Sequence, residues 1–224
     1  MDSVELPEPE LEQALGFLAG LNRRLGGHRV VLSRLDEWTR GWAAGREVSV
    51  LDVGAGAGDH LAAMDGWARR RGLRLRAVGI DSEPAVARSA RRRLAGLRSV
   101  RIVEESLERH AASGARYDFV CASLMLHHVP EEGLVPALQA LDSLAGRGVV
   151  VNDLRRCRAG YWSARLLTAF FGNRVVRHDG PLSVRRAFTL RELGALAARA
   201  GLPYLRPRRH WGFRLSLSGV KTRG

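Results

Sequence analysis

The sequence contains only two cysteines, Cys121 and Cys157, and they lie in unrelated contexts. So few cysteines exclude a disulfide framework and a cysteine-based zinc site, and they lead us to expect a reducing, cytoplasmic location. No apolar run reaches the ~18 residues of a membrane-spanning helix. The acidic N-terminus also lacks the apolar core of a secretion signal, so we expect no membrane span and no export.

Lysine is nearly absent, since Lys221 is the one lysine among 36 cationic side chains in a chain of net charge +13. Basic proteins often bind nucleic acid, because their cations displace counterions from phosphates. However, arginine without lysine in a chain rich in Ala, Leu and Gly is typical of a GC-rich genome. The few aromatic residues do not alternate with the basic runs, which argues against a stacking platform for single strands. A solvated arginine surface is therefore favoured, and an RNA or acidic-partner surface stays open.

Apolar strands and amphipathic helices alternate along most of the 224 residues, which is enough chain for one α/β domain. Two helices come first, and a strictly alternating part follows, which predicts βαβ units and a parallel sheet. We expect helices at about 9–25, 28–44, 59–71, 83–94, 131–145 and 160–172, and strands at about 48–53, 73–80, 100–103, 117–122 and 148–152.

The C-terminal part departs from this alternation. Residues 173–188 read as an irregular stretch, and Thr189 with Glu192 forms a capping box that starts a helix ending at Gly201. Two short segments at about 203–210 and 212–218 predict an antiparallel hairpin at a sheet edge. We therefore expect one domain over 1–224, with lid-forming N-terminal helices (1–46), a core (47–152), a substrate cap (153–188) and a final helix and hairpin (189–224).

A glycine-rich turn follows the first strand of the core. Gly54, Gly56 and Gly58 let the backbone turn tightly and let a ligand approach closely, and Asp52 precedes them by two residues. Asp81 ends the next strand, where a carboxylate can accept hydrogen bonds from ribose hydroxyls. A dinucleotide is the competing ligand. The G-x-G-x-G spacing and the acid favour S-adenosylmethionine (SAM), which has a cationic amino group and no pyrophosphate.

The segments VLDVGAGAGDH, VGIDSEPAVARSARRR and YDFVCASLMLHHVP resemble class I SAM-dependent methyltransferases, most of all the small-molecule branch that contains the ubiquinone and menaquinone methyltransferases. The resemblance covers about residues 48–152. It implies a Rossmann-like, mostly parallel seven-stranded sheet with SAM as the cofactor. Many family members have Asp where this chain has Glu105. The implied cofactor contacts are Asp52, Gly54, Ala55, Gly56, Gly58, Asp81, Ser82, Glu105, Ser106, Leu107, Ala122 and Ser123.

Polar residues that follow the fourth and fifth strands are candidates for the chemistry, because ligands of open α/β sheets bind beyond the carboxyl ends of the strands. Histidine is the side chain whose ordinary pKa lies near neutral pH, and we predict that His127 or His128 is a general base, with His128 the first choice. Asp153 is a further catalytic candidate. Too few hard oxygen ligands are present for a divalent metal, and we expect none. The predicted substrate contacts are Asn152, Arg155, Tyr161 and His178.

The elements NDLRR…YW and RHDGPLSVRRAFT resemble a bacterial group of small methyltransferases encoded near type III polyketide synthases. This resemblance implies O-methylation of a phenolic, quinol or polyketide-like acceptor. We expect a monomer or a homodimer. Two alternatives from other classes stay open. One is an RNA or protein methyltransferase, suggested by the arginine content, and the other is a noncatalytic SAM-binding protein.

Overall fold

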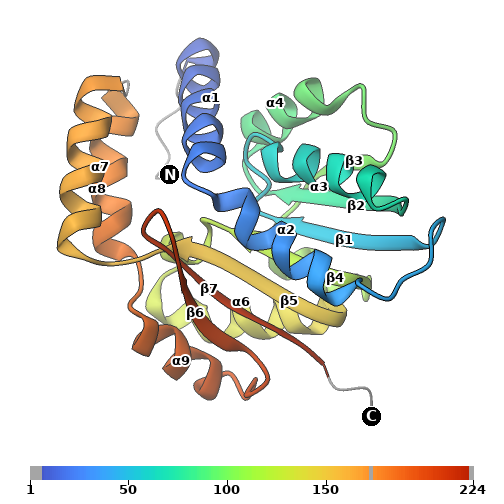
Figure 1. Ribbon diagram of the computed structural model, residues 1–224. Coiled ribbons are helices and arrows are strands. Elements are labelled where there is room, and N and C mark those ends of the chain that lie inside the picture. Colours follow the sequence, from blue (N-terminus) through green and yellow to red (C-terminus); the bar gives the residue numbers. More distant parts are fainter. Residues whose placement is uncertain (1–6, 172–173, 222–224) are drawn as a thin grey trace.

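A seven-stranded sheet in the order β3-β2-β1-β4-β5-β7-β6 forms the centre of the molecule (Figure 1). The computed structural model describes residues 7–171 and 174–221. Strands β1 to β5 pair in parallel, and β7 is antiparallel to both β5 and β6. The expected mostly parallel α/β sheet with a C-terminal antiparallel hairpin is therefore confirmed.

The strands are β1 (Glu47–Val53), β2 (Arg74–Asp81), β3 (Val100–Glu104), β4 (Tyr117–Ser123), β5 (Ala145–Leu154), β6 (Arg206–His210) and β7 (Arg214–Val220). The helices are α1 (Glu8–Arg24), α2 (Gly27–Trp38), α3 (Asp59–Arg70), α4 (Pro84–Leu94), α5 (Leu107–Ala112), the short 3₁₀ turn η1 (Leu126–His128), α6 (Glu131–Leu144), α7 (Arg158–Phe171), α8 (Arg174–Arg186) and α9 (Leu190–Arg199). Within the described chain, no helix combines the length and apolarity needed to span a membrane.

The sheet separates two apolar layers, because successive side chains of a strand point to opposite faces. Leu51 of β1 belongs to the cluster that contains Leu138 of α6. Val50, its neighbour in the same strand, belongs to the cluster that contains Leu35 of α2 and Leu61 of α3. The nearly continuous apolar sequence of β1 is thus explained by helices on both faces.

The structure corrects the expectation for the segment after α7. This segment was predicted to be irregular, but residues from Arg174 to Arg186 form helix α8, with Pro181 inside it. A Cβ on Gly180 would lie 2.7 Å from Cγ2 of Thr168, so α8 packs closely on α7. Such packing outweighs the poor helix propensity of the Gly180-Pro181 pair.

Two smaller differences concern helix boundaries. The second helix was expected to continue to residue 44, but α2 ends at Trp38, where the buried Thr39 side chain donates to the Leu35 carbonyl at 2.7 Å. The short helix α5 was not expected at all, and Ser106 caps its first turn. Single turns of this kind carry too little hydrophobic periodicity to be recognised in a sequence.

The carboxyl ends of β1, β4 and β5 meet at one edge of the sheet. Ser123 of β4 pairs with Asn152 of β5, and Leu154 pairs with Arg214 at the start of β7. Helix α1 and the α7–α8 pair stand beyond this edge (Figure 1). Polar residues that end the strands therefore face a space bounded by the N-terminal helices and by α7–α8.

Replacing Thr189 by Ala is expected to lower the free energy of unfolding by about 1 kcal/mol, because it removes the capping box of α9. The Thr189 hydroxyl accepts from the Glu192 amide at 3.3 Å, and the Glu192 carboxylate accepts from the Thr189 amide at 2.7 Å. Urea unfolding measures the change. Thr189→Ser keeps the acceptor oxygen and is the control, and equal stability of the Ala and Ser variants would contradict the capping role.

Candidate functional site

The glycine-rich turn after β1 needs its glycines for two different reasons. Gly54, Gly56 and Gly58 all have positive φ, at 68°, 53° and 77°. A Cβ on Gly58 would lie 2.4 Å from Leu94, so close packing excludes a side chain there. A Cβ on Gly56 would meet nothing nearer than 3.9 Å. Gly56 thus leaves open space where the turn faces the sheet edge, as a ligand-binding turn requires.

Asp52 is a buried carboxylate with an unsatisfied oxygen. The residue is 2% exposed, and within the described part of the chain its Oδ1 has no hydrogen-bond partner. Burial, followed by the negative charges of Asp59 and Asp81, raises the pKa of Asp52 well above its ordinary value. A buried carboxylate without a partner costs free energy unless it is protonated or meets a cation. This atom is therefore suited to a positively charged group of a ligand.

Asp81 at the end of β2 is held against the same turn. Its Oδ2 accepts from the Gly56 amide at 3.0 Å, and its Oδ1 accepts from the Glu83 amide at 3.1 Å. Burial raises the pKa of Asp81. The neighbouring Ser82 is exposed. Each oxygen of the Asp81 carboxylate keeps a free lone pair that could accept from ligand hydroxyls.

The end of β3 borders this acid. The Glu105 amide donates to the Asp81 carbonyl at 3.0 Å, and the Glu105 side chain contacts Nδ1 of His110 at 2.7 Å. His110 also contacts the Tyr117 hydroxyl at 3.0 Å, so the Glu105 carboxylate is oriented by a buried pair. Ser106 accepts from the Arg109 amide at 3.3 Å. Of the three cofactor contacts predicted after β3, Glu105 and Ser106 therefore have hydrogen-bond partners within the chain. The third, Leu107, is buried in the core.

The remaining predicted cofactor contacts differ in exposure. Ala55 is buried, and its amide donates to the Ile80 carbonyl at 3.0 Å. Ala122 is buried at the end of β4, and the half-buried Ser123 accepts from the Asn152 side chain at 3.4 Å. Asn152 is itself fully buried, which ties β5 to β4.

His127 and Asp153 form a buried pair at the same edge. Nδ1 of His127 lies 2.6 Å from Oδ1 of Asp153, and the two side chains are 3% and 0% exposed. The Asp153 carboxylate also accepts from the His127 amide at 3.2 Å and from the Leu154 amide at 2.7 Å. An ionised Asp153 therefore holds a proton on Nδ1 of His127 and leaves Nε2 as an acceptor.

His128 occupies a different environment, although it is the next residue. It is exposed, and its ring centroid lies 4.1 Å from that of His127. The surrounding protein displaces water from the ring and, together with His127, lowers the pKa of His128 to about 4. A group with such a pKa is uncharged at neutral pH and accepts a proton less readily than an ordinary histidine. The arrangement therefore favours His127 as the base over His128, the first choice of the sequence analysis.

Both histidines line a largely apolar cavity of about 650 Å³. Its wall includes Leu21 of α1, Leu167 of α7 and Val184 of α8. Helix α1 also packs against the glycine-rich turn, because Leu11 and Leu15 form one cluster with Ala57. The cavity thus lies between the two histidines and helices α1, α7 and α8, and α1 also contacts the glycine-rich turn.

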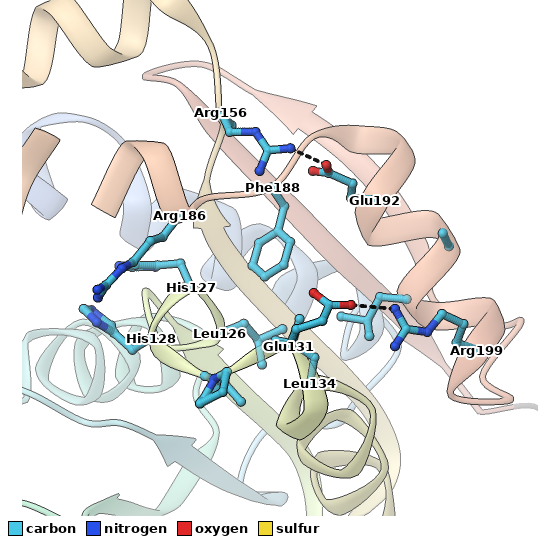
Figure 2. A pocket seen from close by; sticks show the side chains of 14 residues that line it. Leu126, His127, His128, Glu131, Leu134, Arg156, Arg186, Phe188, Glu192 and Arg199 are labelled. Carbon is cyan, nitrogen blue, oxygen red and sulfur yellow. Dashed lines mark hydrogen bonds and ion pairs between the residues drawn. The ribbon is translucent and has the colours of Figure 1, made fainter. Parts of the chain in front are cut away.

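A second cavity of about 660 Å³ lies against the same histidines and is more polar (Figure 2). Arg156 and Glu192 in its wall form an ion pair, and Arg186 points toward His127 and His128 (Figure 2). The apolar cavity is the better candidate for an organic acceptor, because few charged groups there would need to lose their water.

Residues 50–148, which include the glycine-rich turn, Asp81 and both histidines, match the family model described as a methyltransferase domain. This match spans 99 of the 224 residues, so the part of the chain at 50–148 is similar to methyltransferase domains. None of the curated protein sequences is significantly similar to the chain.

Several solved methyltransferases share the fold. Magnesium protoporphyrin IX methyltransferase (ChlM) from Synechocystis PCC 6803 with bound SAH is 19% identical, with a TM-score of 0.57 over 89% of this chain and 85% of that chain. The plantazolicin methyltransferase BpumL in complex with SAH is 15% identical, with a TM-score of 0.66 over 96% and 95%. The CurJ carbon methyltransferase is 14% identical, with a TM-score of 0.63 over 86% and 53%. At these identities the similarity concerns the fold alone.

All four predicted substrate contacts lie outside both cavities as far as their described walls extend, and Asn152 is fully buried in β5. The Arg155 guanidinium lies 5.9 Å from the ring of Phe213. Tyr161 packs edge-on against Trp162. His178 is exposed on α8, 3.1 Å from its neighbour Asp179, which does line the apolar cavity.

A polar cluster beside the glycine-rich turn was missed by the sequence analysis. Oδ2 of Asp59 accepts from His28 at 2.6 Å and from Asn22 at 2.9 Å. The Asn22 amide nitrogen also lies 2.7 Å from Nε2 of His60, and its oxygen accepts from Arg214 at 3.0 Å. An Asn among the apolar residues of a helix is the only sequence signal for this cluster, and it is a weak one.

The types and spacing of His28, Asp59 and His60 would suit a metal ion, since their ligand atoms all lie within 4.8 Å of one another. However, the Asn22 amide already bonds two of these atoms, and Arg214 adds a positive charge beside them. His28, Asp59 and His60 therefore already have hydrogen-bond partners, and these bonds fasten α1 to the start of α3.

Acid is expected to weaken the fold through His60. Burial lowers the pKa of His60 to about 3, against 6.5 ordinarily. Below pH 6.5 the unfolded chain takes up a proton that the folded chain refuses until about pH 3, so stability falls as the pH falls through this window. Replacing His60 by Gln should remove about 1.4 kcal/mol per pH unit from that slope.

Urea unfolding at several pH values measures the slope for the wild type and for His60→Gln. His178→Gln changes an exposed histidine and should keep the wild-type slope. Identical slopes in all three proteins would show that His60 is not buried as a neutral group.

Proposed function

We propose that this methyltransferase transfers the methyl group of SAM to an oxygen atom of a lipophilic small molecule, such as a phenol, a quinol or a polyketide-like compound. The observation that carries the proposal is the buried His127–Asp153 pair in the wall of an apolar cavity at the sheet edge. An oxygen nucleophile gains from such a base, because a phenol is largely protonated at neutral pH.

The residues at the sheet edge fit the cofactor. Asp52 would face the cationic amino group of its methionine end, Gly56 provides the space, and Asp81 would accept from the ribose hydroxyls. When bound, SAM supplies an electrophilic methyl carbon. The proposed further contacts are Gly54, Ala55, Gly58, Ser82, Glu105, Ser106, Leu107, Ala122 and Ser123.

In the proposed reaction His127 accepts the proton of the acceptor hydroxyl at Nε2 while the oxygen takes the methyl group. Asp153 keeps the ring oriented through Nδ1 and stabilises the positive charge that the ring gains. Asp153 is fully buried, so it acts through His127 and is a positioning residue. His128 stays neutral and forms part of the cavity wall.

The apolar wall supports a small lipophilic acceptor bounded by the segment 153–188 as its cap. The resemblances to ubiquinone and menaquinone methyltransferases and to those encoded near type III polyketide synthases agree with this choice. The two basic runs of the sequence are Arg69–Arg71 and Arg91–Arg93, and arginines of both form ion pairs with acids of this chain. Arg69 and Arg71 contact Asp65 and Asp36 at 2.5 and 3.0 Å, and Arg92 and Arg93 both contact Glu12 at 2.7 Å. These ion pairs support the solvated-surface interpretation over an RNA-binding one.

Transfer of a labelled methyl group to a panel of acceptors tests the substrate class. The panel holds alkylresorcinols, quinols, pyrones, simple phenols and total RNA. Label in an extracted phenol or quinol, absent with Asp81→Ala, is the expected result. Label in RNA would replace the proposed acceptor, and bound SAM without label in any acceptor would favour a noncatalytic role.

Replacing His127 by Ala is expected to lower kcat by about 10²–10⁴-fold, because the positioned base is lost. Asp153→Asn should also lower kcat, since it removes the charge that orients His127. Equilibrium binding of SAH should stay unchanged in both variants. His128→Gln is the matched control and should retain most of the activity. A larger loss with His128→Gln than with His127→Ala would transfer the role to His128.

Asp52→Asn is expected to weaken SAH binding by about 10–100-fold, the value of a hydrogen bond to a charged group. Binding of 5′-methylthioadenosine, which lacks the amino-acid end, should change little. Asp81→Asn should weaken both ligands, because both contain the ribose. Calorimetric titration measures all four affinities. Equal losses for the two ligands with Asp52→Asn would contradict an Asp52 contact with the amino group.

A further inference from the structure

Helix α7 exposes apolar side chains on the face that a surface helix normally gives to polar ones. Trp162, Leu166 and Phe170 are 60%, 63% and 73% exposed. They are spaced four residues apart, so they form one stripe along the helix. The opposite face of α7 carries the buried Gly160 and Thr168. The stripe therefore lies on the solvent-exposed side of α7, and the α7–α8 pair stands apart from the sheet (Figure 1).

The stripe is flanked by positive charge. The exposed Arg158 and Arg165 lie on the same helix, and the Arg165 guanidinium is 5.7 Å from the ring of Trp162. Across 158–170 and 176–186 there are five arginines and one acid, Asp179. In the described structure neither Arg158 nor Arg165 has an ion-pair partner. Exposed Trp, Leu and Phe beside unneutralised arginines are the composition of helices that lie in a membrane interface.

The stripe continues into the mouth of the apolar cavity. Leu166 and Phe170 are exposed and also line that cavity, as does Leu18 of α1, which is 42% exposed. A surface that covered the stripe would therefore also cover the opening between α1 and α7. A lipophilic molecule could then pass from that surface into the cavity without crossing water.

We propose that the outer face of α7 docks on an anionic lipid surface. Trp162, Leu166 and Phe170 enter the interface, and Arg158 and Arg165 meet the acidic headgroups. The positive charge beside the stripe selects this occupant, because a second copy of the chain would present like charges to it. The inference concerns the surface of α7 and holds whichever acceptor the methyltransferase uses.

Sedimentation with vesicles tests the proposal on the full-length protein. The wild type should bind vesicles of phosphatidylcholine with phosphatidylglycerol and bind pure phosphatidylcholine much more weakly, with salt reducing the binding. The triple variant Trp162→Ser, Leu166→Ser, Phe170→Ser should lose about tenfold or more in affinity. Arg158→Glu with Arg165→Glu should abolish the preference for anionic vesicles.

Trp211→Ser is the matched control, because Trp211 is 75% exposed but lies in the turn between β6 and β7. It should bind vesicles like the wild type. Unchanged melting temperatures would show that the variants fold. The proposal is overturned if the wild type ignores anionic vesicles or if the triple variant binds them equally well. It is also overturned if the stripe supports a dimer that the triple variant dissociates in sedimentation equilibrium.

Discussion

Two carboxylates are buried at the carboxyl edge of the sheet, and their hydrogen bonds give them different chemistry. Asp153 accepts from two backbone amides and from His127, so both of its oxygens have hydrogen-bond partners. Asp52 has an oxygen with no partner in the described structure, so its charge is stabilised only when a cation arrives. The parallel strand order brings both acids to one edge, where one can orient a base and the other can meet a cofactor.

The features that the sequence predicted well depend on local signals. The turn glycines adopt the positive φ values for which glycine is needed, and Thr189 with Glu192 forms the expected capping box. The position of Asp81 opposite the turn follows from the rule that parallel strands end at the same edge. Each of these features is fixed by a few neighbouring residues, by the strand order, or by both.

The features that sequence reasoning missed depend on contacts between distant segments. His127 and His128 are adjacent in one 3₁₀ turn, and Asp153, 26 residues later, determines which of them is buried and oriented. Helix α8 continues through Pro181 because it packs against α7. Neither the burial of His127 nor the continuation of α8 has a local signal in the sequence. Two adjacent histidines do not indicate which one is buried, and a Gly-Pro pair occurs both in loops and, as here, inside a packed helix.

Arg214 links the polar cluster at α1 with the buried His127–Asp153 pair. It is 2% exposed, and burial lowers its pKa to about 10, so it stays charged at neutral pH. The negative charges of Asp153 and Asp59 act in the opposite direction and raise the pKa of Arg214. Asn22 accepts a hydrogen bond from Arg214 and donates one to Asp59. Asn22 belongs to α1, so the hydrogen bond from Arg214 helps to hold this helix in place. Arg214 also attracts the negative charge of Asp153, the partner of His127. The position of α1 and the electrostatic surroundings of Asp153 therefore both depend on one buried guanidinium.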